Sequence, residues 1–108
     1  MIRNLTPHEI KVVGREDEYI VFPPSGDVAR VSSTSEKVGE VDGIPVSVTT
    51  FGYLSGLPAP EEGVVYLVSL LVRQAAQGVG RKDVVSPDTG PTALRENGQV
   101  VAVRGFCK

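Results

Sequence analysis

The hydrophobic pattern is most regular in residues 64–95, where it predicts a strand, a helix and a second strand in succession. Residues 64–68 form a short, valine-rich apolar run, which is typical of a strand buried on both faces. Apolar residues then recur at helical spacing with polar residues between them, so we expect an amphipathic helix over about residues 69–77. Residues 83–86 form a second short β-rich run, which Pro87 ends because proline has no amide to donate.

This strand–helix–strand unit predicts a rim at which a ligand could bind. Its length fits a crossover between parallel strands, whose carboxyl ends lie at the same edge of a sheet. Ligands in open α/β sheets tend to bind at that edge. Ser69 would cap the helix there, where free amides and partial positive charge favour an anion. The loop that leaves the second strand adds hydroxyls and an acid, in the order Ser86-Pro87-Asp88-Thr89-Gly90-Pro91-Thr92.

Candidate ligand-binding residues come from this rim and from the start of the chain. Asp88 would accept hydrogen bonds from ligand hydroxyls, and Arg95 would supply positive charge. The chain also begins with an amide, a hydroxyl and its only histidine close together, in Asn4-Leu5-Thr6-Pro7-His8. The full candidate set is Asn4, His8, Ser69, Ser86, Asp88, Thr89, Thr92 and Arg95.

Each feature also has a purely structural interpretation. Ser69 could serve only as a helix cap, and the loop around Asp88 could be only a rigid turn, because Asp, Gly and Pro all stabilise turns. His8 is either a general base or ligand group of a site, or a surface or structural histidine that hydrogen-bonds backbone. Arg30, between apolar neighbours, either contacts an anion or is a solvated strand residue. The sequence leaves these alternatives open.

The rest of the chain predicts mainly antiparallel β-structure. Strands are expected over residues 2–5, 9–13, 19–22 and 28–31, and a polar loop over residues 32–37. Asp42-Gly43 and Asn97-Gly98 each separate two β-rich runs, and both pairs suit a type I′ hairpin turn. We therefore expect a single α+β domain over residues 1–108, with a twisted, mixed, mostly antiparallel β-sheet, one principal helix and a C-terminal β-hairpin.

Composition and charge narrow the classes of protein. The 108 residues suffice for one domain with a modest core. The net charge of −2 comes from interspersed acidic and basic residues, so no nucleic-acid partner is expected. No apolar stretch is long enough for a membrane helix, and the N-terminus lacks a signal-peptide core. A lone cysteine, Cys107, forms no internal disulfide, so we expect a cytoplasmic protein without a membrane partner.

The residues that metal or covalent chemistry needs are scattered along the sequence. Metal sites require several donors, whereas His8 and Cys107 stand at opposite ends of the chain, so no metal or other cofactor is expected. A nucleophile such as Ser69 would need His8 beside it, and no spacing supports that. Phosphate-binding, dinucleotide and nucleophile-elbow motifs are also missing. A non-catalytic protein is therefore favoured over a small hydrolase that uses His8 or Asp88.

Several motifs make nearly the whole chain resemble one family. They are residues 4–8 (NLTPH), residues 66–69 (YLVS) with the helix, and residues 83–92 (DVVSPDTGPT) with the hairpin that follows. The family comprises small uncharacterised proteins of bacteriophages, prophages and some bacteria. The resemblance carries over no catalytic residue and implies only a compact cytosolic accessory protein in a phage–host setting.

Two functions follow as expectations. The first is non-catalytic binding of a small polar or anionic ligand, such as a nucleotide-derived signal, at the rim of Ser69 and Asp88. The alternative is a protein-interaction module, such as an inhibitor of a host factor or a small virion component. Exposed sheet edges could pair with a host or phage protein, or with a second copy in a homo-oligomer.

Overall fold

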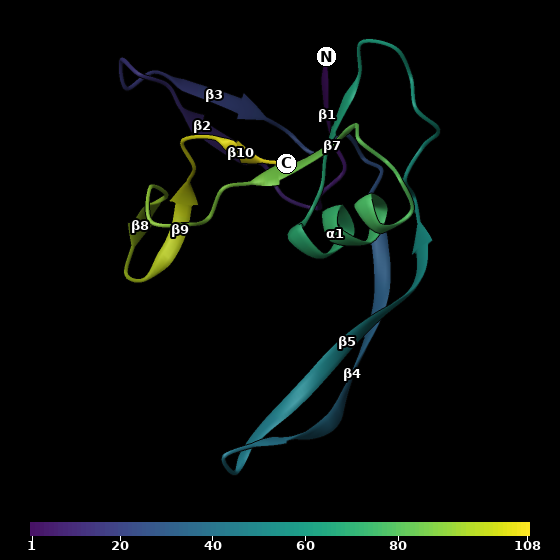
Figure 1. The fold of residues 1–108 in the computed structure, drawn as a ribbon. Helices are drawn as coiled ribbons and strands as arrows, with labels where there is room; N and C mark the ends of the chain where they lie inside the picture. Colours follow the sequence, from purple (N-terminus) through teal and green to yellow (C-terminus); the bar gives the residue numbers. More distant parts are fainter.

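A computed structural model describes residues 1–108 as ten strands and one α-helix (Figure 1). Four short strands form a central mixed sheet in the order β1-β6-β7-β10. These strands are Ile2–Asn4, Val65–Leu67, Val84–Pro87 and Phe106–Cys107. Strand β6 runs parallel to β1 and β7, whereas β10 runs antiparallel to β7. Three antiparallel hairpins, β2–β3, β4–β5 and β8–β9, complete the predicted α+β fold.

Helix α1 (Leu70–Gly78) follows β6, one residue from the predicted bounds. The predicted cap is confirmed, because Ser69 Oγ accepts a hydrogen bond of 3.3 Å from the Val72 amide. At the other end the amides of Gly80 and Arg81 donate to carbonyls of the last turn, which is a Schellman motif. Gly80 has φ of +89°, a left-handed conformation that glycine adopts without steric cost.

The hydrophobic core lies between α1, the central sheet and the base of the β4–β5 hairpin. Residues far apart in the sequence meet there because β1 and β6 pair in parallel. Val31, Leu54 and Leu57 pack against the core while remaining partly exposed. The eight buried members are Leu5, Ala29, Val64, Tyr66, Val68, Val72, Ala76 and Val84.

Two smaller hairpins extend this body on its other side. They consist of β2 (Ile10–Val13) with β3 (Tyr19–Phe22), and β8 (Leu94–Glu96) with β9 (Gln99–Ala102). Backbone hydrogen bonds join β2 to Val103, with Val103 N donating to Lys11 O and Val13 N donating to Val103 O. The predicted Asn97-Gly98 turn is confirmed, with φ of 53° and 81°.

The β4–β5 hairpin projects from the body and is much longer than the sequence predicted (Figure 1). Strand β4 is Arg30–Val41 and β5 is Ile44–Ser55, joined by the predicted Asp42-Gly43 turn with φ of 50° and 81°. The prediction of a loop over residues 32–37 is wrong, because these residues pair with β5. They show no apolar alternation because neither face is buried. We call residues 32–50 the arm, since every one of them is exposed.

The arm makes the molecule elongated. The radius of gyration is 16.0 Å, against about 13 Å for a compact chain of this length. A β-bulge at the base of the arm sets two residues of β5, Gly52 and Tyr53, opposite Ser32. The Tyr53 amide donates to Ser32 Oγ at 3.1 Å. Because of this bulge, Phe51 and Leu54 lie on the same face, the one that Leu54 turns toward the core.

Candidate functional site

The rim predicted from the sequence exists in the structure. Strands β6 and β7 are parallel neighbours, with Leu67 opposite Val85, and the Val68 amide donates to Val85 O at 2.9 Å. Ser69 therefore follows the end of β6 on the same edge of the sheet at which Asp88 follows β7. The expectation that the two strand exits share an edge is confirmed.

The two exits do not open into a common cavity. Ser69 lines a groove of about 220 Å³ together with Thr6, Pro7 and other residues of the body. Thr89 instead lines a separate hollow of about 150 Å³, between the start of β2 and strand β9. Asp88, Thr92 and Arg95 line neither space. The rim is thus divided between the groove at Ser69 and the hollow at Thr89.

The loop between Pro87 and Leu94 uses its polar groups on itself. Asp88 Oδ1 accepts a hydrogen bond of 3.0 Å from the Gly90 amide, which is the turn that the structural interpretation expects. Arg95 donates from its guanidinium to the carbonyls of Thr89 and Gly90, at 2.5 and 3.1 Å. The Asp88 amide also donates to Gly105 O at 2.9 Å, which ties the loop to the C-terminal segment. Asp88 and Arg95 therefore shape the loop, while the Thr92 side chain makes no hydrogen bond within the chain and is exposed.

Ser86 lies inside the sheet rather than on the rim. Ser86 is 1% exposed, and its Oγ has no hydrogen-bond partner within the chain. Along β7 it alternates with the partly exposed Val85 and Pro87, and it points to the same side as the fully buried Val84. Ser86 lines neither the groove at Ser69 nor the hollow at Thr89.

Asn4 occupies the centre of a buried hydrogen-bond cluster. Its Nδ2 donates to the carbonyls of His8 and Phe22, each at 2.9 Å. Its Oδ1 accepts from Thr6 N at 2.9 Å and from Thr6 Oγ1 at 2.7 Å. The cluster fixes the segment after β1 against the end of β3. The His8 side chain is exposed and makes no hydrogen bond, so the residue contributes to the cluster only through its backbone.

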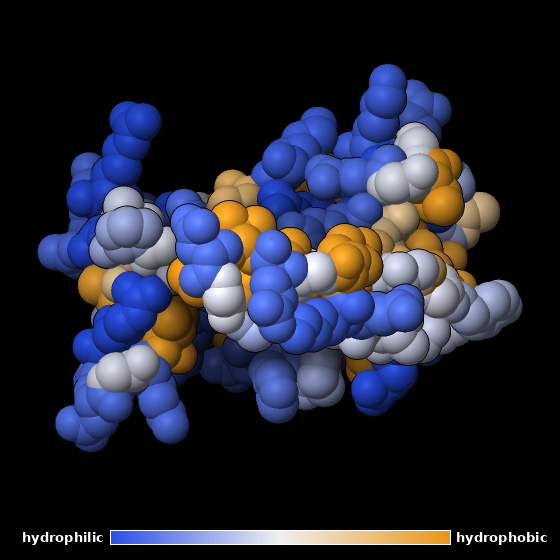
Figure 2. Space-filling model, turned by 60° about the horizontal axis from the view of Figure 1, so that its bottom comes forward, coloured by the Kyte–Doolittle hydropathy of each residue, from blue (hydrophilic) through white to orange (hydrophobic).

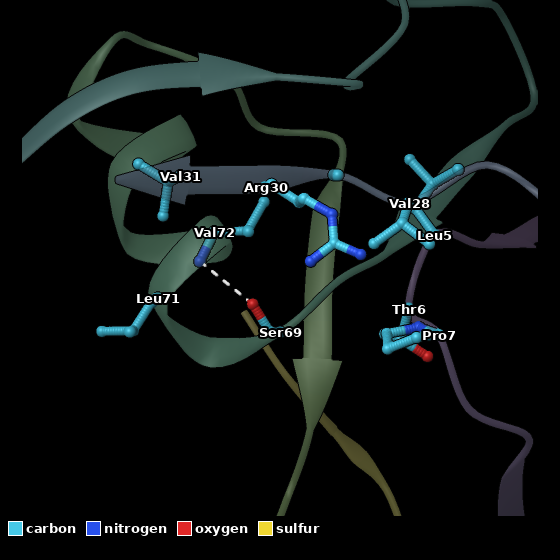
Figure 3. Close-up of a pocket in the computed structure, with 10 residues that line it drawn as sticks. Leu5, Thr6, Pro7, Val28, Arg30, Val31, Ser69, Leu71 and Val72 are labelled. Carbon is cyan, nitrogen blue, oxygen red and sulfur yellow. Dashed lines mark hydrogen bonds between the residues drawn. The ribbon is translucent and has the colours of Figure 1, made fainter. Parts of the chain in front are cut away.

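Arg30, which was not among the predicted site residues, adds a positive charge to the groove at Ser69. Figure 3 shows the Arg30 guanidinium projecting between Ser69 and Val28, beside the N-terminus of α1. Arg30 is exposed, belongs to neither ion pair of the protein and makes no side-chain hydrogen bond. The first turn of α1 carries no acidic residue. The groove therefore combines apolar walls with a positive guanidinium and a helix N-terminus, which suits a small anionic group.

A partly buried ion pair with two hydrogen bonds lies at the opposite end of α1. Arg81 donates from Nε and Nη2 to the two carboxylate oxygens of Asp83, at 2.9 and 2.8 Å, and from Nη2 to Pro58 O at 2.8 Å. Its guanidinium also lies 6.0 Å from the centroid of the Tyr66 ring. These hydrogen bonds raise the pKa of Arg81 and lower the pKa of Asp83, while partial burial opposes both shifts. The arrangement fixes the segment before β6 to the body.

Comparisons with known proteins identify no relative: no protein-family model, curated protein or solved structure matches this chain. No three side chains among His, Cys, Asp and Glu gather closely enough to hold a metal ion together. The single helix falls short of the length and apolar character that crossing a bilayer requires.

The arm is the feature that sequence reasoning missed. Its turn was predicted, but its length and its projection from the body were not. Residues 38–41 and 44–50 were expected to be β-rich runs on either side of the turn, whereas residues 32–37 carried no hydrophobic signal for a strand. Figure 2 turns the end of the molecule that bears the arm toward the reader, and apolar groups are exposed there beside polar ones.

Proposed function

We propose that the protein is a protein-interaction module that binds its partner through the arm. The observation that carries this proposal is the complete exposure of residues 32–50 in a hairpin whose strands each have twelve residues. An isolated two-stranded hairpin is at best marginally stable in water, and a third strand or a packed face normally supports it. The arm has neither within the chain.

One face of the arm carries an apolar stripe along β5 that nothing in the chain covers, and Glu36 of β4 flanks this stripe opposite Val48. Ile44, Val46 and Val48 alternate along β5 and so share a face, and Val41 lies on that face opposite Ile44. Val41 is 61% exposed, Ile44 67% and Val48 50%. Removing apolar side chains from water is the main favourable term in protein association, so covering this face would stabilise a complex. The resemblance to phage and prophage proteins supports a partner from a phage or its host.

Photo-crosslinking from the full-length chain in its host cells tests this proposal. A photoreactive phenylalanine analogue replaces Val46 on the arm or, as a matched control, the exposed Gln74 on α1. We expect protein adducts from position 46 and none from position 74. If position 46 gives no adduct with any protein, another copy of the chain included, the proposed function is refuted.

The groove at Ser69 supports a second candidate function, the binding of a small anionic ligand. The observation that favours it is the unpaired Arg30 guanidinium beside the helix N-terminus (Figure 3). The volume of about 220 Å³ is below the roughly 300–1,000 Å³ of typical ligand pockets, so the groove suits a phosphate or carboxylate group rather than a whole nucleotide.

Thermal shift measurements with inorganic phosphate, sugar phosphates and nucleotides test the second candidate. A ligand in the groove should stabilise the wild type and the Arg15→Gln control but not Arg30→Gln. A ligand held by the loop would lose its effect in Asp88→Ala instead. The absence of any stabilising compound would reject the ligand-binding function.

A further inference from the structure

We infer that the partner of the arm is a second copy of this chain, paired β5 to β5 in antiparallel direction about a two-fold axis near Val48. The inference rests on the proposed function and names the molecule that the arm binds. The pairing would join two hairpins into one four-stranded antiparallel sheet, in the order β4-β5-β5-β4. Each arm would then have the additional strands that a free hairpin lacks.

The two edges of the arm are not equivalent. Strand β4 is charged and irregular, since it carries Glu36, an ion pair of 2.7 Å between Lys37 and Glu40, and a register shift between Lys37 and Gly39. Charges and bulges are the usual means by which edge strands avoid pairing. The edge of β4 is therefore protected against pairing with another strand, which leaves the edge of β5 as the available one.

Strand β5 lacks charges along its whole length, from Ile44 to Ser55. Pro45 lies near its tip and the bulge at Gly52 lies near its base, but the run between them, residues 46–51, has no proline, glycine or charge. All but the last of these six residues are exposed, and the only strand that pairs with them is β4. An uncharged exposed edge of this kind is a template for another strand.

Two-fold symmetry explains why a second copy fits this edge. In an isologous contact a charge near the axis meets the same charge of the other copy, and β5 has no charge to repel itself. An axis through Val48 sets Val48 against its counterpart, and Val46 against Thr50 of the other copy. Residues of one face thus meet residues of the same face, so the uncharged side chains of the two β5 strands lie side by side, with Glu36 of each β4 on the outer flank.

The area of this contact predicts a weak dimer. Six residues of strand extend about 20 Å, and a sheet is about 10 Å thick, so each copy contributes on the order of 200 Å² to the contact. Even with flanking side chains the total stays below the roughly 1,200 Å² of stable interfaces. Since the body of each copy has its own core, we expect a folded monomer in reversible, concentration-dependent equilibrium with the dimer.

Sedimentation velocity over a concentration series tests the self-pairing. The wild type and Thr34→Lys should gain mass with concentration, whereas Val48→Lys should stay monomeric. Thr34 is the matched control because it lies on the same face but on β4, opposite Thr50. Equal melting temperatures of the two variants would show that both are folded. A wild type that stays monomeric to about 1 mM, or a dimer indifferent to Val48→Lys, would overturn the inference.

Disulfide trapping tests the geometry directly. Single cysteines at positions 47, 48 and 49 are introduced in a Cys107→Ser background, which removes the only native thiol. A disulfide needs Cα atoms about 4.4–6.8 Å apart, so the position on the axis should form covalent dimers under mild oxidation. Ser35→Cys, on the far strand, should not. Dimers that form as fast from position 35 would refute β5 pairing.

The crosslinking from position 46 separates failure of this inference from failure of the proposed function. Adducts between two copies support both. Adducts only with another protein leave the arm as an interaction surface and refute self-pairing. The absence of adducts refutes both.

Discussion

Replacement of Asn4 by alanine is predicted to be one of the most destabilising single changes in the protein. The residue is 3% exposed, and its side chain makes four hydrogen bonds, two as donor and two as acceptor. Alanine removes all four, and its methyl group offers neither a donor nor an acceptor in their place. The Thr6 hydroxyl can then donate its single proton to the His8 carbonyl, which lies 2.9 Å away, but the Thr6 amide and the Phe22 carbonyl lose a partner.

The expected loss of unfolding free energy is about 3 kcal/mol, because each net hydrogen bond contributes about 1 kcal/mol and buried groups without partners add a desolvation cost. The midpoint of thermal unfolding should then fall by roughly 10–20 °C. Chemical denaturation and thermal melting followed by circular dichroism measure both quantities. Gln74→Ala, on the exposed side of α1, is the control and should change little. If Asn4→Ala costs no more than this control, the cluster does not hold the N-terminal segment as argued.

Three other changes follow from the structure. Replacing residues 36–48 with Asn-Gly should leave the melting temperature of the monomer nearly unchanged, because no removed side chain is buried. A large fall in the melting temperature would show that the arm stabilises the body. Asp83→Asn should destabilise the protein at neutral pH, because the lowered pKa of Asp83 in the fold stabilises the protein only while the carboxylate is charged. The difference in unfolding free energy between wild type and variant should therefore narrow as the pH falls below the ordinary carboxyl pKa of 3.8. A difference that stays constant with pH in denaturation curves would contradict the pairing with Arg81. Gly98→Ala should lower the unfolding free energy by about 1 kcal/mol, because Gly98 has φ of +81°. Gly39→Ala, at a position without a positive φ, should lower it less, and equal losses would argue against the left-handed turn.

Local patterns explain which parts of the fold could be predicted from the sequence. Apolar periodicity, the Ser69 cap and the stop at Gly80 specify α1 within one residue, because each acts over a few neighbouring positions. The turns at Gly43 and Gly98 were predictable for the same reason, since their conformation requires glycine. The parallel neighbours β6 and β7 followed from the length of the segment between them.

The candidate site and the arm depended on contacts that sequence patterns do not record. Arg30 and Ser69 are far apart in the sequence, and they line the same groove only because β4 packs beside α1. The sequence showed that Asn4 is polar, as a ligand-binding residue would be, but not that it is buried. Because it is buried, its side chain hydrogen-bonds other residues of the chain rather than a ligand. Residues 32–37 have no hydrophobic period because both of their faces meet water, so only pairing with β5 reveals them as a strand.

The extra residue at the base of the long hairpin marks the boundary between the packed body and the exposed outer strands. Leu54 pairs with Val31 on the body side of this bulge, so its orientation toward the core does not depend on how many opposed pairs lie further out. Shortening or lengthening the hairpin by whole pairs would change its reach without repacking the domain.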